Sequence, residues 1–383
     1  MPNHDIRIQF ITFLEKKGSR GYPLGILSIS AFLKANGYRN IGYLEFDLFS
    51  CVRDKSIRRC KHALPCTEGA RDDRIAWLID HPPAILFIGP VFTYNLRYFV
   101  EFAIFMKKLF PNVLIFGGGP HFGKILANDR ELLARHPHIA GLVIGDGEET
   151  TLDLLDAVSS DLRAGGDLES KINEPIEKHV AGSIATIPGI LIARNQFTRR
   201  VPFDIERNVL LPDYTLIRNN PFFVGYTLTR RKNPISFNHK HFFYEARKQR
   251  MPFAYINGSR GCPYPCIFCA GASNVWDPQA LGGSRRLGRR VVQPEAILAE
   301  IKHVHGMFGT TTFFFTDPLF LAPSKSDFDR IDKLFTLVLR ESQRSGVKYR
   351  FILELRIDVV NKMPVAMLSK MMAAGVHEIN LGF

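Results

Sequence analysis

Apolar, strand-like segments alternate with helical patterns along the first part of the chain, and this alternation limits the fold more than any other feature. Strands are predicted at 5–13, 41–46, 84–89, 112–116 and 141–145, with helices after Pro23, at 95–109, at 122–135 and from 148. The segment 84–89 is apolar throughout, as expected of a central strand that a parallel sheet buries on both faces. The sequence therefore predicts an α/β fold with a doubly wound parallel sheet of about five strands.

A second alternation begins near residue 253. Strands are predicted at 253–256, 311–317, 349–356 and 378–382, with helices from Pro294 and at 326–343 and 364–374. Parallel strands connected in this way curl into a β/α barrel that binds its ligands at the C-terminal face. We therefore divide the chain into an α/β domain at 1–160, a linker with short strands and a basic segment at 161–248, and a barrel-type domain at 249–383.

Composition narrows the classes of protein that fit. The 383 residues suffice for two or three domains with cores of their own. No apolar run reaches the ~18–20 residues of a membrane-spanning helix, and the N-terminus lacks a signal-peptide pattern. Six cysteines in a chain of this length favour a reducing compartment, so we expect a cytoplasmic protein.

The formal net charge of +13 is compatible with an anionic ligand, an acidic membrane surface or nucleic acid. The basic runs at 230–232, 247–250 and 285–290 have aromatic residues near the first two, an arrangement that can bind single-stranded nucleic acid. No recognised nucleic-acid motif is present, and solvated surface is the simpler interpretation of each run. We therefore do not expect a nucleic-acid partner.

Three cysteines follow the predicted strand 253–256 with the spacing Cys-x-x-x-Cys-x-x-Cys. They are Cys262, Cys266 and Cys269, and Pro263 and Pro265 keep the loop between them from winding into a helix. Three thiolates from one loop can hold three corners of a cubane 4Fe–4S cluster. The fourth iron is then open to a substrate or cofactor, whereas a fully ligated cluster can only pass electrons.

Two other interpretations of the cysteines stay open. The trio could bind zinc or be reduced core thiols, although a zinc site needs a fourth Cys or His at close spacing and none follows within the loop. The remaining cysteines, Cys51, Cys60 and Cys66, could form a second metal site with His62. Their irregular spacing and basic surroundings instead favour a surface segment with reduced thiols.

Small residues mark the carboxyl ends of four predicted elements in the first domain, at 21–25, 89–93, 117–121 and 145–149. Ligands of doubly wound sheets bind at this edge, glycines let a bulky ligand approach the backbone, and helix N-termini favour anionic groups. The residues expected to line such a ligand are Pro23, Gly25, Thr93, Gly117, Gly118, Gly119, Pro120, His121, Gly145 and Glu148.

The cysteine spacing, with Phe268 directly before the last cysteine, resembles the radical S-adenosylmethionine (radical SAM) superfamily. The loops of the first domain are similar to those of the cobalamin-binding-type domain that precedes many radical SAM enzymes. The shared segments are Pro-Leu-Gly at 23–25, Gly-Gly-Pro-His at 118–121 and Gly-Asp-Gly-Glu-Glu at 145–149, and Leu-Pro-Asp-Tyr at 211–214 resembles the bridge between the two domains. The resemblance covers about 5–160 and 250–383.

The resemblance also implies residues that contact S-adenosylmethionine (SAM). Phe-Thr-Asp-Pro-Leu-Phe at 315–320 is similar to the family segment after the second barrel strand, with Pro318 in place of a second Asp. Glu354-Leu-Arg356 matches the third strand, where polar groups reach the ribose and carboxylate of SAM. The implied SAM contacts are Phe268, Asp317, Glu354 and Arg356. A salt bridge inside the barrel is the alternative for Glu354 and Arg356.

The sequence departs from the family pattern at two places. The Asp-x-His-x-x-Gly motif that ligates cobalt in cobalamin mutases is absent, because Gly119 stands where that motif has Asp before His121. Cobalamin binding therefore stays open, and a polar loop residue is the simpler interpretation of His121. Family members continue beyond the position of Phe383, so we expect the chain to be a fragment or a truncated form with four of the usual barrel strands.

The resemblance implies a radical SAM enzyme that cleaves SAM reductively at a 4Fe–4S cluster to form a 5′-deoxyadenosyl radical. The first choice is a cobalamin-dependent methyltransferase acting on an unactivated carbon of a small molecule, with electrons from an external flavodoxin or ferredoxin. A radical SAM cyclase or rearrangement enzyme without methyl transfer is the alternative enzyme. An iron–sulfur electron-transfer protein and a cobalamin carrier with an inactive barrel are the non-catalytic alternatives.

Overall fold

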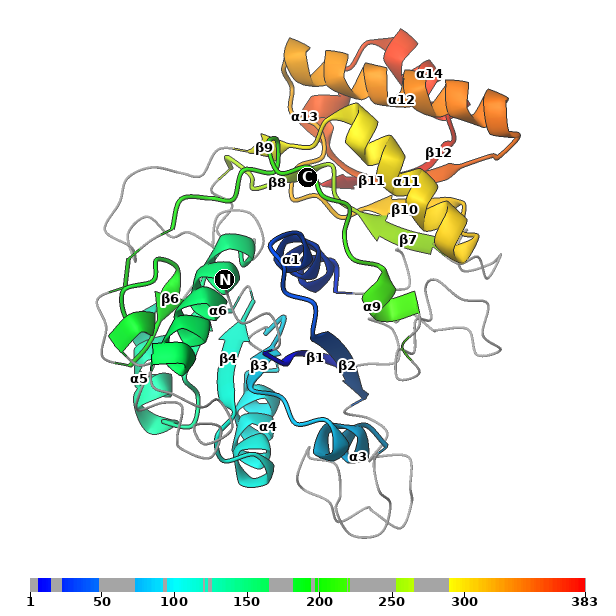
Figure 1. Cartoon of the computed structure of the whole chain (residues 1–383). Coiled ribbons are helices and arrows are strands. Elements are labelled where there is room, and N and C mark those ends of the chain that lie inside the picture. Colours follow the sequence, from blue (N-terminus) through cyan, green and yellow to red (C-terminus); the bar gives the residue numbers. More distant parts are fainter. Residues whose placement is uncertain are drawn as a thin grey trace, which may run out of the picture.

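The computed structural model describes residues 6–14, 23–47, 73–91, 95–119, 121–122, 126–164, 182–193, 197–198, 200–218, 220, 253–264 and 289–382. Two separate sheets organise these residues, one near each end of the chain (Figure 1). None of the described helices combines the length and the apolar character that crossing a bilayer requires.

The first sheet has the strand order β2-β1-β3-β4-β5-β6. Its strands are β1 (Ile8–Leu14), β2 (Ile41–Asp47), β3 (Ile85–Ile88), β4 (Leu114–Gly118), β5 (Gly141–Val143) and β6 (Ile190–Leu191). The first five run parallel, which confirms the predicted doubly wound sheet, and β6 is antiparallel to β5. Strand β3 is buried at every position, as its uniformly apolar sequence predicts.

Helices cover both faces of this sheet. They are α1 (Leu24–Ala35), α3 (Asp73–Asp80), α4 (Leu96–Leu109), α5 (Leu126–Arg135) and α6 (Glu148–Ala164). Leucines of α1 and α6 pack with the rings of Phe10, Phe87 and Phe116 on one face. Side chains of α3, α4 and α5 pack against Ile11 and Ile115 on the other. Helix α3 was not predicted from the sequence.

The second sheet has the order β12-β11-β10-β7, with every neighbouring pair parallel. Its strands are β7 (Phe253–Ile256), β10 (Thr312–Phe315), β11 (Arg350–Arg356) and β12 (Val376–Gly382). The helices of this part are α11 (Pro294–Phe308), α12 (Lys325–Ser345), the short α13 (Ile357–Val360) and α14 (Val365–Ala373). The three long helices and four strands confirm the second β/α alternation.

The predicted helix boundaries follow from local signals. Pro294 occupies the first turn of α11, where its missing N–H has no helical partner to lose. Ser324 caps α12 by accepting a hydrogen bond from the backbone N–H of Asp327. A two-stranded ribbon of β8 (Ser259–Arg260) and β9 (Arg290–Val291) was not predicted, and it brings together the two ends of the cysteine-containing segment.

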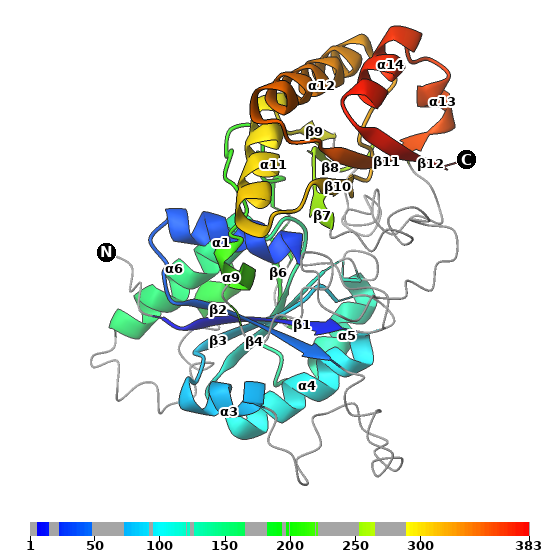
Figure 2. The ribbon, with the colours of Figure 1, turned by 90° about the vertical axis from the view of Figure 1, so that its right-hand side faces the viewer.

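The two parts meet at α1, which lies between the first sheet and the second domain (Figures 1 and 2). Two adjacent residues of the bridge, just before the short helix α9 (Thr215–Arg218), bind one domain each. The carboxylate of Asp213 accepts a hydrogen bond from Ser30 Oγ at 2.7 Å and pairs with Lys34 Nζ at 2.6 Å, both on α1. The hydroxyl of Tyr214 donates to Glu300 Oε1 of α11 at 2.6 Å.

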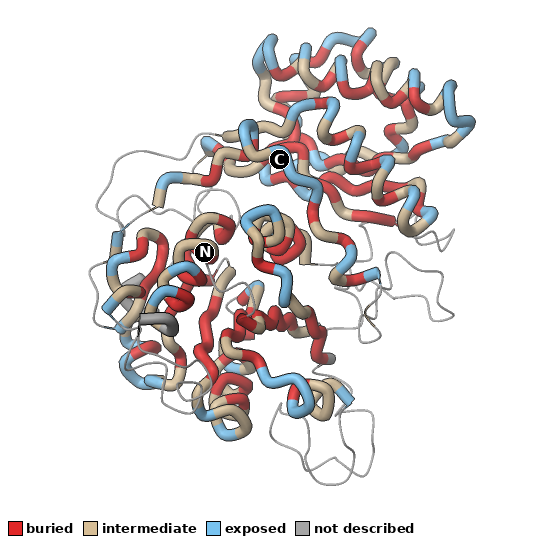
Figure 3. The backbone as a smooth tube through the Cα atoms, in the orientation of Figure 1, coloured by how far each residue is buried: buried red, intermediate tan, exposed pale blue. Residues whose placement is uncertain are grey.

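One buried apolar cluster passes through this junction. It includes Leu27 of α1, Tyr214 of the bridge and Ile297 of α11, and it extends into both sheets. Figure 3 shows buried backbone in both sheets and along α1 and α11. The junction is therefore a packed core rather than a loose connection.

Candidate functional site

The floor of the candidate site consists of glycine-rich turns after β3 and β4. Gly119 has φ +135°, and a Cβ added there would lie 2.3 Å from the backbone nitrogen of Val91. A Cβ added at Gly89 would lie 2.6 Å from the carbonyl oxygen of Gly118. The two turns therefore pack backbone against backbone, which only glycine permits at these positions.

A cavity of about 530 Å³ opens above these turns, between the first sheet and the second domain. The first domain contributes residues at the carboxyl edge of its sheet and the start of α1, and the second domain contributes the ends of β7 and β10. The lining residues include Phe10, Pro23, Gly25, Phe87, Gly89, Gly117, Gly118, Gly119, Gly145, Asp146 and Glu148 from the first domain, and Asn257, Ser259, Arg260, Gly261, Arg290, Thr316 and Pro318 from the second. The strand ends of both sheets thus face one shared space.

The structure brings together seven of the residues predicted to contact a cobalamin-type ligand. Pro23, Gly25, Gly117, Gly118, Gly119, Gly145 and Glu148 all line the cavity. Thr93 and Pro120 lie outside the described residues. These positions converge because the strands are parallel, so their carboxyl ends share one edge of the sheet.

His121 occupies a different place. His121 is not among the described residues that line the cavity. It is 7% exposed, its ring lies edge-on against Phe122 at 5.3 Å, and its backbone N–H donates to the carbonyl of Val91. Burial lowers the pKa of His121, which keeps the imidazole neutral near pH 7. In this structure the side chain is buried against Phe122.

The cysteine loop begins at the edge of the cavity. Gly261 lines the cavity, and the next residue, Cys262, is a buried thiol with 8% exposure. Cys266, Cys269 and Phe268 lie outside the described residues. No group of three possible metal-ligating side chains is found within the part of the chain that the structure describes. The cysteine trio therefore stays a prediction, and the structure describes only its first member, Cys262, next to the cavity-lining Gly261.

Asp317, predicted to contact SAM, is 3% exposed and bonded to the segment that leads into the cysteine loop. Its carboxylate accepts hydrogen bonds from the backbone N–H of Gly258 at 2.9 Å and from Ser259 Oγ at 2.6 Å. Burial raises the pKa of Asp317 to about 6, although these two hydrogen bonds oppose the shift. The neighbours of Asp317 in the chain, Thr316 and Pro318, are the ones that line the cavity.

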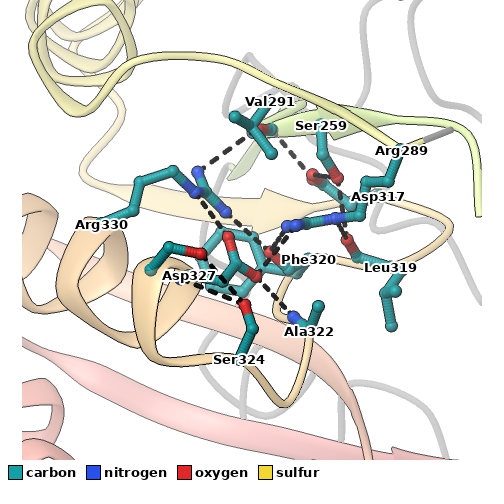
Figure 4. Close-up of polar contacts among 12 residues, drawn as sticks. Ser259, Arg289, Val291, Asp317, Leu319, Phe320, Ala322, Ser324, Asp327 and Arg330 are labelled. Atoms are coloured by element: carbon teal, nitrogen blue, oxygen red, sulfur yellow. Dashed lines mark hydrogen bonds and ion pairs between the residues drawn. The ribbon is translucent and has the colours of Figure 1, made fainter.

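Two buried arginines support the same region (Figure 4). The carboxylate of Asp327 pairs with Arg289 Nη1 at 2.9 Å and Arg330 Nε at 2.8 Å, and all three side chains are less than 10% exposed. Arg289 also donates to the carbonyls of Leu319 and Phe320, the residues that follow β10. This network holds the loop after β10 against the start of α12.

Glu354 and Arg356 lie two residues apart on β11. Although Glu354 is solvent-exposed, neighbouring protein atoms partly desolvate its carboxyl group. This desolvation raises the pKa of Glu354. The Arg356 guanidinium lies 3.8 Å from the ring centroid of Tyr264, two residues beyond Cys262, and its Nε pairs with Asp358 at 2.8 Å. The end of β11 therefore lies beside the start of the cysteine loop, as the predicted SAM contacts require. Neither residue is among the described residues that line the shared cavity.

Sequence reasoning missed a charged contact across the cavity wall. Arg260 Nη2 pairs with Glu148 Oε1 at 2.7 Å, and Arg290 Nη1 pairs with Asp146 Oδ2 at 2.6 Å. Burial would lower the pKa of Arg260, but Glu148 and Asp146 raise it above its ordinary value. All four charged residues lie in motifs noted from the sequence. No local sequence pattern, however, indicates that residues more than 100 positions apart pair with one another.

Relatives in sequence cover part of the chain. No protein-family profile matches it. An uncharacterised methyltransferase of Pyrococcus horikoshii is 24% identical over 224 residues, which is 58% of this chain and 37% of the relative. The 2-(S-pantetheinyl)-carbapenam-3-carboxylate methyltransferase of Streptantibioticus cattleyicolor is 24% identical over 204 residues, which is 52% of this chain and 24% of the relative. The chain thus spans well under half the length of these relatives.

Solved structures match almost the whole chain. The radical SAM methyltransferase TsrM of Kitasatospora setae, solved with cobalamin and a [4Fe–4S] cluster, matches 98% of this chain and 61% of its own, with TM-score 0.57 and 14% identity. The cobalamin-dependent SAM radical enzyme OxsB, solved with aqua-cobalamin and SAM, matches 99% of this chain and 44% of its own, with TM-score 0.62 and 13% identity. The predicted resemblance is confirmed at the level of the fold: this chain has the architecture of cobalamin-dependent radical SAM enzymes.

Proposed function

We propose that the chain forms the cofactor-binding part of a cobalamin-dependent radical SAM methyltransferase that acts on an unactivated carbon of a small molecule. The observation that carries the proposal is the shared cavity, which the strand ends of both sheets enclose and from which the cysteine loop departs after Gly261. Two cofactors that react with one substrate need one common space, and this fold supplies it.

The residues around the cavity fit a broad, bulky cofactor such as cobalamin. A Cβ added at Gly25 would meet no atom within 4 Å, so open space lies above the start of α1. The glycine turns at Gly89 and Gly119 keep the floor flat, and Phe10 and Phe87 add apolar surface. In this proposal Pro23, Gly145 and Thr93 complete the contacts.

The donor set of the second domain fits a site-differentiated cluster. Cys262, Cys266 and Cys269 would hold three irons, and the fourth would be open to the amino and carboxylate groups of SAM. When bound, the cluster supplies one electron to SAM and cobalamin supplies a carrier for the methyl group. The electron comes in this proposal from an external flavodoxin or ferredoxin.

The protein's own groups orient SAM. Arg356 is a suitable donor for a carboxylate because its planar guanidinium can bind two oxygens, and Glu354 can accept from ribose hydroxyls. We retain Phe268 as a further contact. The contacts of Asp317 with Gly258 and Ser259 support a different role, in which it fixes the strand end that leads into the cysteine loop.

The proposal is tested by anaerobic reconstitution of the protein with iron, sulfide and hydroxocobalamin, followed by incubation with SAM and a reductant. We expect retention of cobalamin and an EPR signal of the reduced cluster that changes on SAM addition. We also expect S-adenosylhomocysteine in an amount comparable to the bound cobalamin. Cys266→Ala should abolish the EPR signal and all SAM turnover.

Cys60→Ala is the matched control, because it removes a thiol outside the trio and should leave these signals unchanged. Formation of 5′-deoxyadenosine without cobalamin retention or S-adenosylhomocysteine would replace the methyltransferase with a cyclase or rearrangement enzyme. A cluster whose EPR signal ignores SAM would indicate an electron-transfer protein. Zinc in place of iron at the cysteine trio would overturn the proposal altogether.

A further inference from the structure

The β8–β9 ribbon lies between the two domains and makes contacts to both. Its strands pair antiparallel, with Arg260 opposite Arg290, and the chain between them carries the cysteine motif. The ribbon therefore forms the base from which the cysteine-containing segment leaves and to which it returns. Because Cys262 lies two residues beyond Arg260, a shift of the ribbon would also move Cys262.

One face of the ribbon is bonded to the first domain. Asp146 accepts from Arg290 Nη1 at 2.6 Å and from Arg260 Nη1 at 3.4 Å, while Glu148 accepts from Arg260 Nη2 at 2.7 Å. Arg290 Nη1 also donates to the carbonyl of Phe203 at 2.6 Å. The Glu148 side chain is 3% exposed, so solvent screens this pair weakly.

The other face of the ribbon is bonded to the second domain. Successive residues of a strand point to opposite faces, so Ser259 of β8 points away from the first domain. Ser259 Oγ donates to Asp317, and Arg289, the residue before β9, pairs with Asp327 on the same side (Figure 4). The ribbon and its flanking residue are thus hydrogen-bonded on both faces.

The same contacts form a wall of the shared cavity. Asp146, Glu148, Arg260 and Arg290 all line the cavity of about 530 Å³. A smaller cavity of about 80 Å³, which Glu148, Arg260 and Glu300 line, lies at the same contact. A cofactor bound against the loop 145–148 would therefore contact the side chains that bind the ribbon to the first domain.

We propose that the Asp146–Glu148 loop, Arg260 and Arg290 couple the two cofactor sites, so that a ligand seated in the first domain sets the position of the segment 256–262 that leads into the cysteine motif. Arg260 is the central positioning residue among the described residues, because it pairs with both Asp146 and Glu148. This inference rests on the proposed function. Coupling of binding sites is reciprocal, so cobalamin should strengthen SAM binding and SAM should strengthen cobalamin binding by the same factor.

Hydrogen exchange of the protein without ligands provides the first test. Arg260→Gln should raise amide exchange both in 144–149 and in 256–262, because it releases the ribbon and the loop together. Glu148→Gln, which changes only one acceptor group, should do the same to a smaller extent. Arg200→Gln is the matched control, since Arg200 of the linker pairs with Glu149 and Asp153 of the first domain and not with the ribbon. It should not alter exchange in 256–262.

Ligand binding provides the second test. In the reconstituted wild type, saturating hydroxocobalamin should lower the Kd for SAM by about fivefold or more, a typical size for coupling between sites. The coupling is measured as the ratio of the Kd values for SAM without and with saturating hydroxocobalamin, so a change in either single affinity cancels. Arg260→Gln and Glu148→Gln should bring this ratio close to one, Arg260→Lys should regain part of it, and Arg200→Gln should retain it in full.

The results separate this inference from the proposed function. If both ligands bind but the Kd for SAM is independent of hydroxocobalamin in the wild type, the coupling is overturned and the proposed function stands. Equal coupling in Arg260→Gln and wild type also overturns it. If hydroxocobalamin and SAM do not bind at all, the proposed function fails and the coupling fails with it.

Discussion

Two buried carboxyl groups carry raised pKa values, and their partners give them different roles. Glu300 lies at the domain junction, where burial raises its pKa to about 7 and the Tyr214 hydroxyl opposes the shift. Asp317 lies beside the cysteine loop, where burial raises its pKa to about 6. An acid whose pKa is raised by folding stabilises the fold below its ordinary pKa, and that contribution is lost as the pH rises through the folded-state value.

Tyr214→Phe tests the pH dependence at the junction. The hydrogen bond from Tyr214 favours the ionised carboxylate, so its removal should raise the pKa of Glu300 further above about 7. The free energy of unfolding should fall by about 0.5–1.5 kcal/mol at pH 5, where Glu300 is neutral, and by about 1.5–3 kcal/mol at pH 8.5, where it is ionised. Urea unfolding at both pH values measures the difference.

The double variant Tyr214→Phe with Glu300→Gln is the control, because position 300 then has no carboxyl group to titrate. Its free energy of unfolding should lose the pH dependence attributed to Glu300. Equal losses of stability at pH 5 and pH 8.5 in Tyr214→Phe would contradict the assignment.

The turns after β3 and β4 show how elements make the site. The glycines of these turns cannot be replaced by residues with a side chain, because backbone atoms of one turn occupy the space where a Cβ of the other would lie. The predicted strands that lead into these turns are confirmed, and so are the helices α4 and α5 that follow. The short elements α3, α9, α13, β8 and β9 were missed. A strand of two residues has no periodicity of its own and exists only through its partner strand.

Gly119→Ala tests the turn directly. The added Cβ would lie 2.3 Å from the nitrogen of Val91 and would strain a residue with φ +135°. We expect a loss of stability of about 1–3 kcal/mol and a clear weakening of hydroxocobalamin binding, measured by thermal unfolding and by equilibrium dialysis.

Gly306→Ala in α11 serves as the comparison, because its added Cβ would meet no atom within 4 Å. This variant should gain up to about 1 kcal/mol from helix propensity and keep its cobalamin affinity. An unchanged Gly119→Ala protein would show that the turn can move without consequence.

Within the described residues, one buried apolar cluster is shared by the two sheets, while the face of the first sheet that α3, α4 and α5 cover has a cluster of its own. The shared cluster passes from the first sheet through α1 and the bridge to α11 and the second sheet. Because the junction is packed, the two sheets should keep a fixed separation when the cavity is filled. Under the proposed function, the distance between the two cofactors would depend on this junction.

The shared cluster predicts one cooperative unfolding transition for the protein without cofactors. Tyr214→Ala should lower the free energy of unfolding by about 3–5 kcal/mol and separate the transition into two, because it empties the position where the halves meet. Differential scanning calorimetry measures both effects. Leu334→Ala, a buried truncation within α12, should lower the transition temperature without separating the halves. Two transitions in the wild type would contradict a shared core.

Much of the candidate site could be predicted because it is local. The glycines after parallel strands, the cysteine spacing and the start of α1 are properties of short segments, and seven of the predicted ligand contacts do line one cavity. His121 belongs to the same glycine-rich loop, yet its side chain packs against Phe122 and is not among the described residues that line the cavity. Neighbours in a loop can point to opposite sides, and the direction depends on which side the sheet and helices already fill.

Backbone preferences and apolar periodicity act over a few residues, so the order of strands and helices, the parallel sheets and the glycine turns were all readable from the chain alone. The pairing of Arg260 with Glu148 and Asp146, the contact of Arg356 with Tyr264 and the binding of Asp317 by Gly258 and Ser259 were not. Each of these contacts joins segments far apart in sequence. The Arg260 contacts exist only after the two domains have packed, and the other two exist only after distant segments of the second domain have packed together. No short segment carries that information.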